Sequence, residues 1–157
     1  MKLKLGLQPP LSLAILIALF VVGCAASQSV TLPSPAAVEA RQRLMKAMGA
    51  NWADAQAKFK AGNVEGVAVN AESLALMMEQ VPGLFPVGSM LANSKAKSEV
   101  WDDYPKFVST AKNSAAVAVQ LRDAARSKNP STTESIMKEF GAKACGSCHT
   151  PFRQPAK

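Results

Sequence analysis

The chain has 157 residues, of which 48% are hydrophobic, and its 18 basic and 11 acidic side chains give a formal net charge of +7. The basic excess is spread along the chain and no basic block is interleaved with aromatic residues, which excludes nucleic acid as a partner. A mildly basic surface would instead attract an acidic protein partner, and the length suits a single domain.

Residues 1–26 have the order of an export signal: two lysines, then an apolar run from Leu11 to Val22, then small residues. The apolar run of about a dozen residues is shorter than the ~20 residues that a membrane-spanning helix requires. We therefore expect a cleaved signal peptide and a mature protein that works in the periplasm.

Two cleavage routes remain open for this signal. The stretch "VVGC", Val21–Cys24, resembles the lipobox of bacterial lipoproteins, in which the cysteine becomes the lipidated first residue. Lipidation would anchor the protein at Cys24 without spanning the membrane. The alternative is ordinary cleavage near Ala26. In the lipoprotein case, cleavage before Cys24 removes Lys2 and Lys4 and no acid, so the net charge falls from +7 to +5.

The remaining sequence indicates an all-α fold, because no useful stretch alternates with a period of two and alanine is abundant. The first helix is expected over about 36–60 and the second over about 64–81, each with an apolar stripe. The segment 81–97 contains two prolines and two glycines and is expected to be a long loop. The third helix is expected over about 98–127, with Pro105 separating off a short first turn.

The fourth helix is predicted to begin at "STTE", Ser131–Glu134, which has the form of a capping box with Ser131 as N-cap. Pro151 marks its end or a kink. Four helices of moderate length in one small domain favour an antiparallel four-helix bundle over residues 36–155, with the longest connection between the second and third helices.

Two cysteines and the single histidine of the chain lie close together in "CGSCH", Cys145–His149. Cys145, Cys148 and His149 stand at positions i, i+3 and i+4, which share one face of a helix. This is the spacing for attachment of a c-type haem: each thiol bonds one vinyl group, and the histidine binds the iron from one side. The motif therefore predicts one covalent haem c with His149 as axial ligand.

A function of another class stays open for the same residues, namely a non-haem helical module. A Cys145–Cys148 disulfide could stabilise such a module in an oxidising compartment. A zinc ion would need a fourth ligand from a carboxylate or a partner chain. A thiol oxidoreductase is disfavoured because that chemistry places the cysteines at the start of a helix in a βαβ unit. No catalytic set or nucleotide loop is visible, so we do not expect an enzyme.

Few residues follow His149, so the other face of the haem is expected to be covered from upstream. From about Val38 to Arg153 the chain resembles the class II c-type cytochromes, the cytochrome c prime family with its low-spin Met-ligated branch. Three motifs carry the resemblance: "RQRLMK" (Arg41–Lys46), "EVW" (Glu99–Trp101) and "CGSCHTPFR" (Cys145–Arg153).

The resemblance implies roles for three residues of the first helix. Arg41 and Gln42 map to the haem edge, where Arg41 could pair with a propionate. Met45, one turn later, maps to the position that faces the iron. Family members also have an aromatic and a basic residue after the histidine, here Phe152 and Arg153. Pro151 departs from the family pattern and is expected to distort the last helical turn, which carries Arg153.

Two functions follow from the resemblance. If Met45 covers the iron without bonding to it, the iron is five-coordinate and binds small gases such as NO or CO. If Met45 is the sixth ligand, the haem is low-spin and suits electron transfer, because Met/His ligation raises the reduction potential. Redox partner proteins are expected, and the resemblance also implies a homodimer through contacts of the first helix.

Overall fold

The computed structural model describes residues 34–155. The expected signal peptide and the lipid attachment at Cys24 lie outside this range. Within it, no helix has the length and apolar character that crossing a membrane requires.

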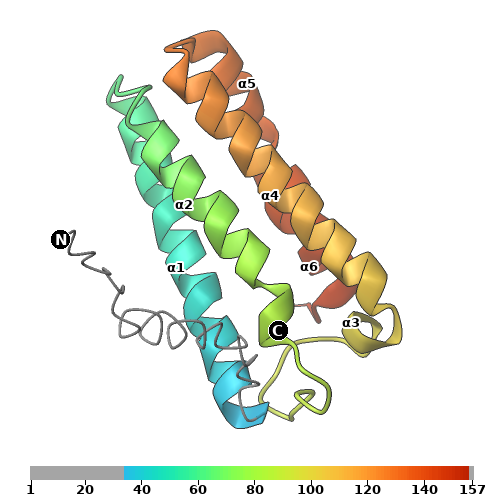
Figure 1. Cartoon of the computed structure of the whole chain (residues 1–157). Helices are drawn as coiled ribbons and strands as arrows, with labels where there is room; N and C mark the ends of the chain where they lie inside the picture. Colours follow the sequence, from blue (N-terminus) through green and yellow to red (C-terminus); the bar gives the residue numbers. More distant parts are fainter. Residues whose placement is uncertain (1–33, 156–157) are drawn as a thin grey trace, which may run out of the picture. The chain divides into compact units, whose positions relative to one another are not determined.

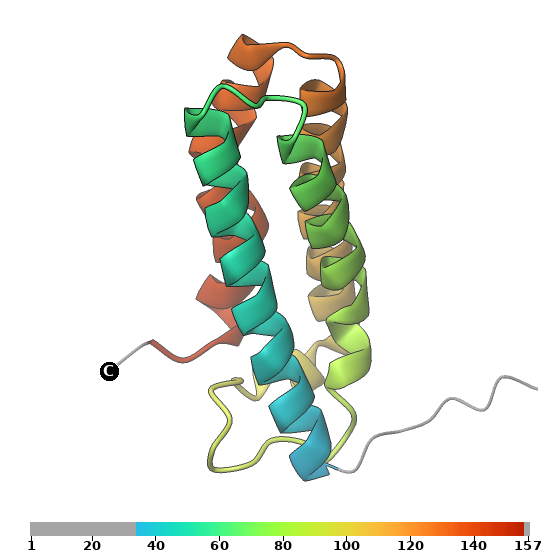
Figure 2. The same ribbon diagram turned by 90° about the vertical axis from the view of Figure 1, so that its left-hand side faces the viewer.

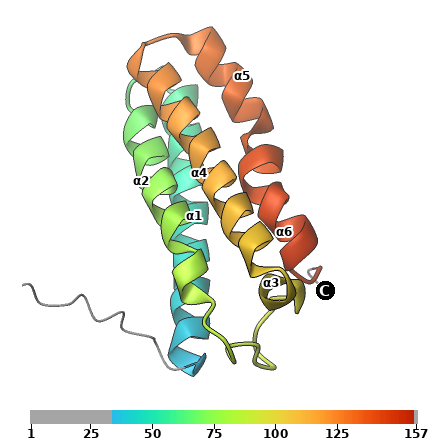
Figure 3. The same ribbon diagram turned by 45° about the vertical axis from the view of Figure 1, so that its right-hand side comes forward.

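The described chain forms four helical columns that run alternately up and down, as Figures 1 and 3 show. The fourth column consists of three consecutive segments, which stand alongside α4 in Figure 3. This arrangement confirms the predicted all-α four-helix bundle. The elements are α1 (Ser34–Lys60), α2 (Val67–Gln80), η1 (Pro82–Leu84), α3 (Glu99–Asp102), α4 (Tyr104–Arg126), α5 (Pro130–Phe140), η2 (Gly141–Gly146) and α6 (Ser147–Phe152).

The start of the fourth helical column differs from the sequence-based prediction. The fourth column begins at Pro130, and its N-cap is Asn129, whose side-chain oxygen accepts a hydrogen bond from Thr132 N at 3.0 Å. The predicted cap Ser131 is therefore wrong, because Pro130 suits the first helical position and moves the cap one residue earlier. The expected break before Pro105 is present: Asp103 ends α3 and caps α4 by accepting a hydrogen bond from Lys106 N.

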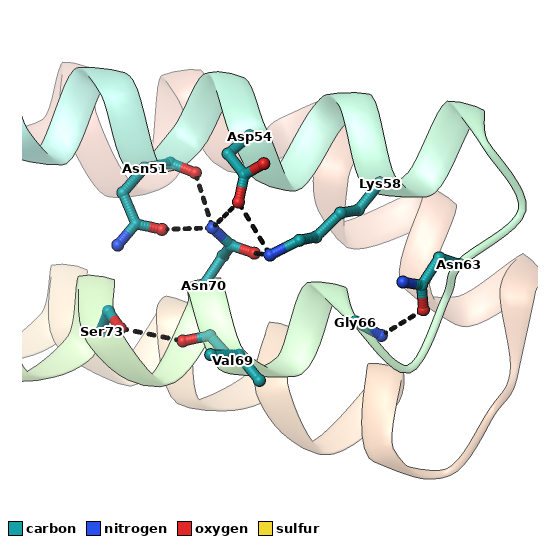
Figure 4. Close-up of polar contacts among 8 residues, drawn as sticks. All are labelled: Asn51, Asp54, Lys58, Asn63, Gly66, Val69, Asn70 and Ser73. Atoms are coloured by element: carbon teal, nitrogen blue, oxygen red, sulfur yellow. Dashed lines mark hydrogen bonds and ion pairs between the residues drawn. The ribbon is translucent and has the colours of Figure 1, made fainter.

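A polar cluster fixes α1 against α2 near the connection between them (Figure 4). Asn70 of α2 is nearly buried and donates to Asn51 Oδ1 at 2.7 Å and to Asp54 Oδ2 at 2.8 Å. Its own oxygen accepts from Lys58 Nζ at 2.8 Å, and Lys58 also pairs with Asp54. A buried amide whose hydrogen bonds are all satisfied favours one axial register over others. This cluster therefore fixes the register of α1 relative to α2.

The helices pack unequally. The most extensive packing joins α2 and α4, and α4 also contacts α5, η2 and α6. Among the described elements, the backbone of α1 approaches that of α2 closely and that of η1 locally, without comparable contact to α4, α5 or α6. Figure 2 shows α1 and α2 side by side from their shared connection downward. Large side chains and internal space therefore separate α1 from the fourth column.

Candidate functional site

Two cavities lie in the region between α1 and the fourth column. The larger has a volume of about 440 Å³ and the smaller about 150 Å³. Four residues line both: Met45, Val81, Cys148 and His149. The cavities therefore adjoin at Met45 of α1 and His149 of α6, and their combined space is in the range of small-molecule and cofactor sites.

The larger cavity has an aromatic and aliphatic wall. Phe107 packs edge-on against Phe85 at 4.9 Å and against Phe152 at 5.2 Å between ring centroids. Val81 and Val100 complete this buried cluster, and all five residues line the cavity. Such a wall suits a large, flat, apolar ligand.

The attachment motif lies where the helix geometry changes. The segment η2 is a π-helix, and its geometry is evident in the hydrogen bond from Ser147 N to Ala142 O, five residues back. The prediction of a regular α-helix through the motif was therefore wrong for Cys145, which lies in η2. Cys148 and His149 lie in α6 and line both cavities, whereas Cys145 lines the smaller one.

Both cysteines are half-buried free thiols. Burial raises the pKa of the Cys145 thiol, and the nearby Cys148 raises it further. Burial also raises the pKa of Cys148, although hydrogen bonds from Ser114 and Ser147 act in the opposite direction. The buried Ser114 hydroxyl of α4 lies 3.1 Å from Ser147 Oγ and 3.7 Å from Cys148 Sγ. Two hydroxyl groups thus surround the second thiol of the motif.

His149 is half-buried beside a positive charge. Burial lowers the pKa of its imidazole, and the charge of Arg153 lowers it further, so the neutral form that can bind a metal is favoured. Pro151 lies within α6, the helix ends at Phe152, and Arg153 has an extended backbone. Arg153 nevertheless lines the larger cavity together with His149. Arg153 therefore lies at the site despite the departure from the family pattern at Pro151.

The three expected residues of α1 all line the larger cavity. Met45 is half-buried and packs against the aromatic cluster. Gln42 is exposed and donates to Asn93 O at 3.2 Å. Arg41 is only 5% exposed, and its guanidinium donates four hydrogen bonds to Leu84 and to two serines of the 82–97 connection. The structure thus brings these residues to the same cavity as Cys148 and His149.

The charges around the larger cavity are of one sign. Arg41, Lys46, Lys95 and Arg153 line it, and no acidic residue does. None of the four cations forms an ion pair with another described residue. An apolar cavity with unpaired cations and no acid suits a flat apolar ligand that carries carboxylates. Haem has this chemistry, so the residues present fit it.

The non-haem alternatives have less support from the described residues. Over 34–155, no group of three or more histidine, cysteine, aspartate and glutamate side chains is arranged to hold a metal ion. Cys145, Cys148 and His149 are therefore not gathered around a common metal position in this structure. The two thiols are also not joined to each other.

Some lining residues were not predicted. Ser94, Lys95 and Ala96 come from the loop between η1 and α3, whose path no periodicity indicates. Ser114 lies mid-helix in α4, where a single serine gives no signal of a contact with a distant cysteine. The aromatic residues Phe85, Trp52 and Phe140 also line the cavities.

The chain is similar to known proteins in both sequence and structure. The family model described as Cytochrome C′ matches residues 36–153. A cytochrome c′ of Pararhodospirillum photometricum is 33% identical over 121 residues, which cover 74% of this chain and 95% of the relative.

Two solved structures from Alcaligenes xylosoxidans, a nitric oxide complex and a carbon monoxide complex of cytochrome c prime variants, superpose with TM-scores of 0.68 at 21% identity. They cover 78% of this chain and 97% and 98% of those chains, and at this identity they show the shared fold. The family match extends over nearly all described residues, and the chain therefore belongs to the cytochrome c′ family of non-enzymatic proteins that carry one covalent haem c.

Proposed function

We propose that Cys145 and Cys148 hold the haem covalently, that His149 is the proximal iron ligand, and that the protein binds NO or CO on the opposite face. One observation carries the proposal: Met45 and His149, from different helices, both line the two cavities where these adjoin. The nitric oxide and carbon monoxide complexes of structural relatives support gas binding.

The residues of the chain would divide the work as follows. When bound, the haem supplies an iron centre that binds diatomic gases or exchanges one electron. Burial and the charge of Arg153 lower the pKa of His149, which favours the neutral imidazole whose nitrogen would bind the iron. Arg41, Lys46, Lys95 and Arg153 provide positive charge for the carboxylates, and the aromatic cluster excludes water from the ring.

Haem attachment is tested on protein produced with a cytochrome c maturation system. The expected result is a pyridine haemochrome spectrum of a covalent haem that resists extraction by acidified acetone. Cys145→Ala and Cys148→Ala should each leave one thioether bond, which the mass of the haem-bearing peptide reports. Fully extractable haem in the unmutated protein would overturn the proposal and favour the non-haem helical module.

A second candidate is a low-spin electron carrier in which Met45 is the sixth ligand. The contact of Met45 with both cavities favours this residue over the other methionines for that position. A high-spin, CO-reactive ferrous protein would exclude ligation by Met45 and support gas binding. A low-spin protein that becomes high-spin on Met45→Ala would support the electron carrier.

Location and partners belong to the same proposal. The signal sequence supports a periplasmic protein, either free or anchored through a lipid at Cys24. Incorporation of labelled palmitate that is lost in Cys24→Ala would establish the anchor, and its absence in both proteins would favour ordinary cleavage. Sedimentation of the holoprotein tests the homodimer, and the salt dependence of its reduction rate tests an acidic redox partner.

A further inference from the structure

The segment 82–97, here called the strap, connects the two sides of the candidate site. On the α1 side it is held by Arg41. The guanidinium donates from Nη1 to Leu84 O at 3.3 Å and to Ser89 Oγ at 3.0 Å. It donates from Nη2 to Ser89 O and to Ser94 Oγ, both at 2.7 Å. One side chain of α1 therefore holds three separate points of the strap.

Aromatic rings enclose the same guanidinium. Its central carbon lies 4.5 Å from the ring centroid of Phe85 and 6.0 Å from that of Trp101. The indole of Trp101 in turn donates to Phe85 O and Pro86 O of the strap, at 3.2 and 3.1 Å. Arg41 has no carboxylate partner among the described residues, and within the described chain its buried charge is compensated by carbonyls, hydroxyls and ring faces.

The far end of the strap is joined to α6 and the residues that follow it. Lys97 N donates to Phe152 O at 3.0 Å, and Gln154 N donates to Lys95 O at 2.8 Å. Lys97 Nζ donates to Thr150 O, next to His149, at 3.1 Å. Because these are mostly backbone bonds, they set a fixed distance between the strap and the helix that carries His149.

The backbones of α1 and α6 make no extensive close contact, so the distance between these helices depends on side chains and on the strap. One described connection beside the larger cavity runs from Arg41 through the strap to Phe152. Arg41 also lies one helical turn before Met45, so the residue that holds the strap and the residue expected over the iron share one face of α1.

We propose that Arg41 is a positioning residue: by holding the strap it fixes the spacing of α1 and α6, and so the approach of Met45 to the iron that His149 binds. This inference rests on the proposed function and extends it. Releasing the strap would change the spin state or the gas-binding kinetics while the haem remains attached. Lysine should not replace Arg41, because an ammonium group cannot reach four acceptors on three different residues at once.

The test compares holoproteins carrying Arg41→Met, Arg41→Lys, or the pair Ser89→Ala and Ser94→Ala with the unmutated protein. The serine pair removes two acceptors of Arg41 and keeps its charge. Arg43→Met is the matched control, since Arg43 is exposed on the same helix and pairs with Glu39. Hydrogen exchange at the Lys97 and Gln154 amides reports the strap, and spin state and CO-binding rates report the site.

The expected result is amide exchange at least about tenfold faster in both Arg41 variants, because several charged hydrogen bonds are lost. The spin-state ratio or the CO rate should shift by about threefold or more in the Arg41 variants and in the serine pair, with unchanged haem content. Arg43→Met should behave as the unmutated protein does.

Two results would overturn the inference. If Arg41→Met alters gas binding and the serine pair does not, Arg41 acts through its charge and not through the strap. If exchange accelerates without any change at the haem, the strap does not position Met45. If Arg41→Met fails to fold, Arg41→Lys and the serine pair still decide between these outcomes. The haem content of the unmutated protein is measured before any variant is compared. If that protein carries no covalent haem, the proposed function is overturned, and this result is distinct from a failure of the strap inference.

Discussion

The buried hydroxyl of Ser114 lies 3.7 Å from the sulfur of Cys148, although the two residues come from different helices. A larger side chain at position 114 would occupy the space beside the second thiol. We expect Ser114→Leu to lower the fraction of haem attached at Cys148 and to cost about 1–3 kcal/mol of stability through overpacking. The pyridine haemochrome band and peptide masses measure attachment.

A second substitution at the same site separates space from hydrogen bonding. Ser114→Ala should keep both thioether bonds and lose about 0.5–1.5 kcal/mol. Ser109→Leu, at an exposed position of α4, is the control and should leave attachment unchanged. Full attachment at Cys148 in Ser114→Leu would contradict the assigned contact.

The cluster around Asn70 predicts a pH dependence (Figure 4). Hydrogen bonds from Lys58 and then Asn70 lower the pKa of Asp54 below its ordinary value of 3.8. A lowered folded-state pKa means that the stability from Asp54 is present above the unfolded value of 3.8 and is lost as the pH falls through the folded value. The melting temperatures of the unmutated protein and Asp54→Asn should therefore converge in acid. Parallel curves would contradict this.

The packing of α4 against α2 predicts a large difference between two leucines. Leu121 is completely buried in the core shared by these helices, whereas Leu76 on α2 is 52% exposed. Leu121→Ala should cost about 2–5 kcal/mol because it leaves a cavity. Leu76→Ala should cost about 0.5 kcal/mol or less. Chemical denaturation measures both, and similar losses would show that the core is wrongly placed.

The corrected start of α5 predicts which side chain caps it. Asn129→Ala should lower stability by about 0.5–2 kcal/mol, because Thr132 N loses its acceptor. Ser131→Ala, the change at the cap expected from the capping-box pattern, should be nearly neutral. Thermal denaturation of the two variants measures the difference. A larger loss of stability in Ser131→Ala than in Asn129→Ala would contradict the cap at Asn129 and favour the capping box at Ser131.

The parts that could be predicted from sequence are those set by short-range chemistry. Cys145, Cys148 and His149 stand out because covalent attachment and iron binding require a fixed order and spacing. Helix positions followed from apolar periodicity and from proline and glycine. The cap at Asn129 was missed because two local signals disagree. The capping-box pattern favours Ser131 as N-cap, whereas Pro130 suits the first helical position and favours Asn129.

The remaining features depend on long-range contacts. The burial of Arg41 comes from carbonyls and hydroxyls of the strap, whose irregular path leaves no periodic signal. The residues Gly141–Gly146 could equally form an α-helical turn, and nothing in their sequence indicates a π-helix. The position of Cys145 in a π-helical turn could therefore not be predicted. The resemblance placed Arg41 at the haem edge, but its hydrogen bonds to the strap appear only in the folded structure.

The lack of close backbone contact between α1 and α6 has a thermodynamic consequence. A molecule that fills the space between them binds the folded bundle and not the unfolded chain, so it raises the free energy of unfolding. For an ordinary ligand this gain grows with ligand concentration. A group joined through Cys145 and Cys148 cannot diffuse away, so its contribution is the same at any dilution, and denaturation must expose the group together with the aromatic wall that covers it.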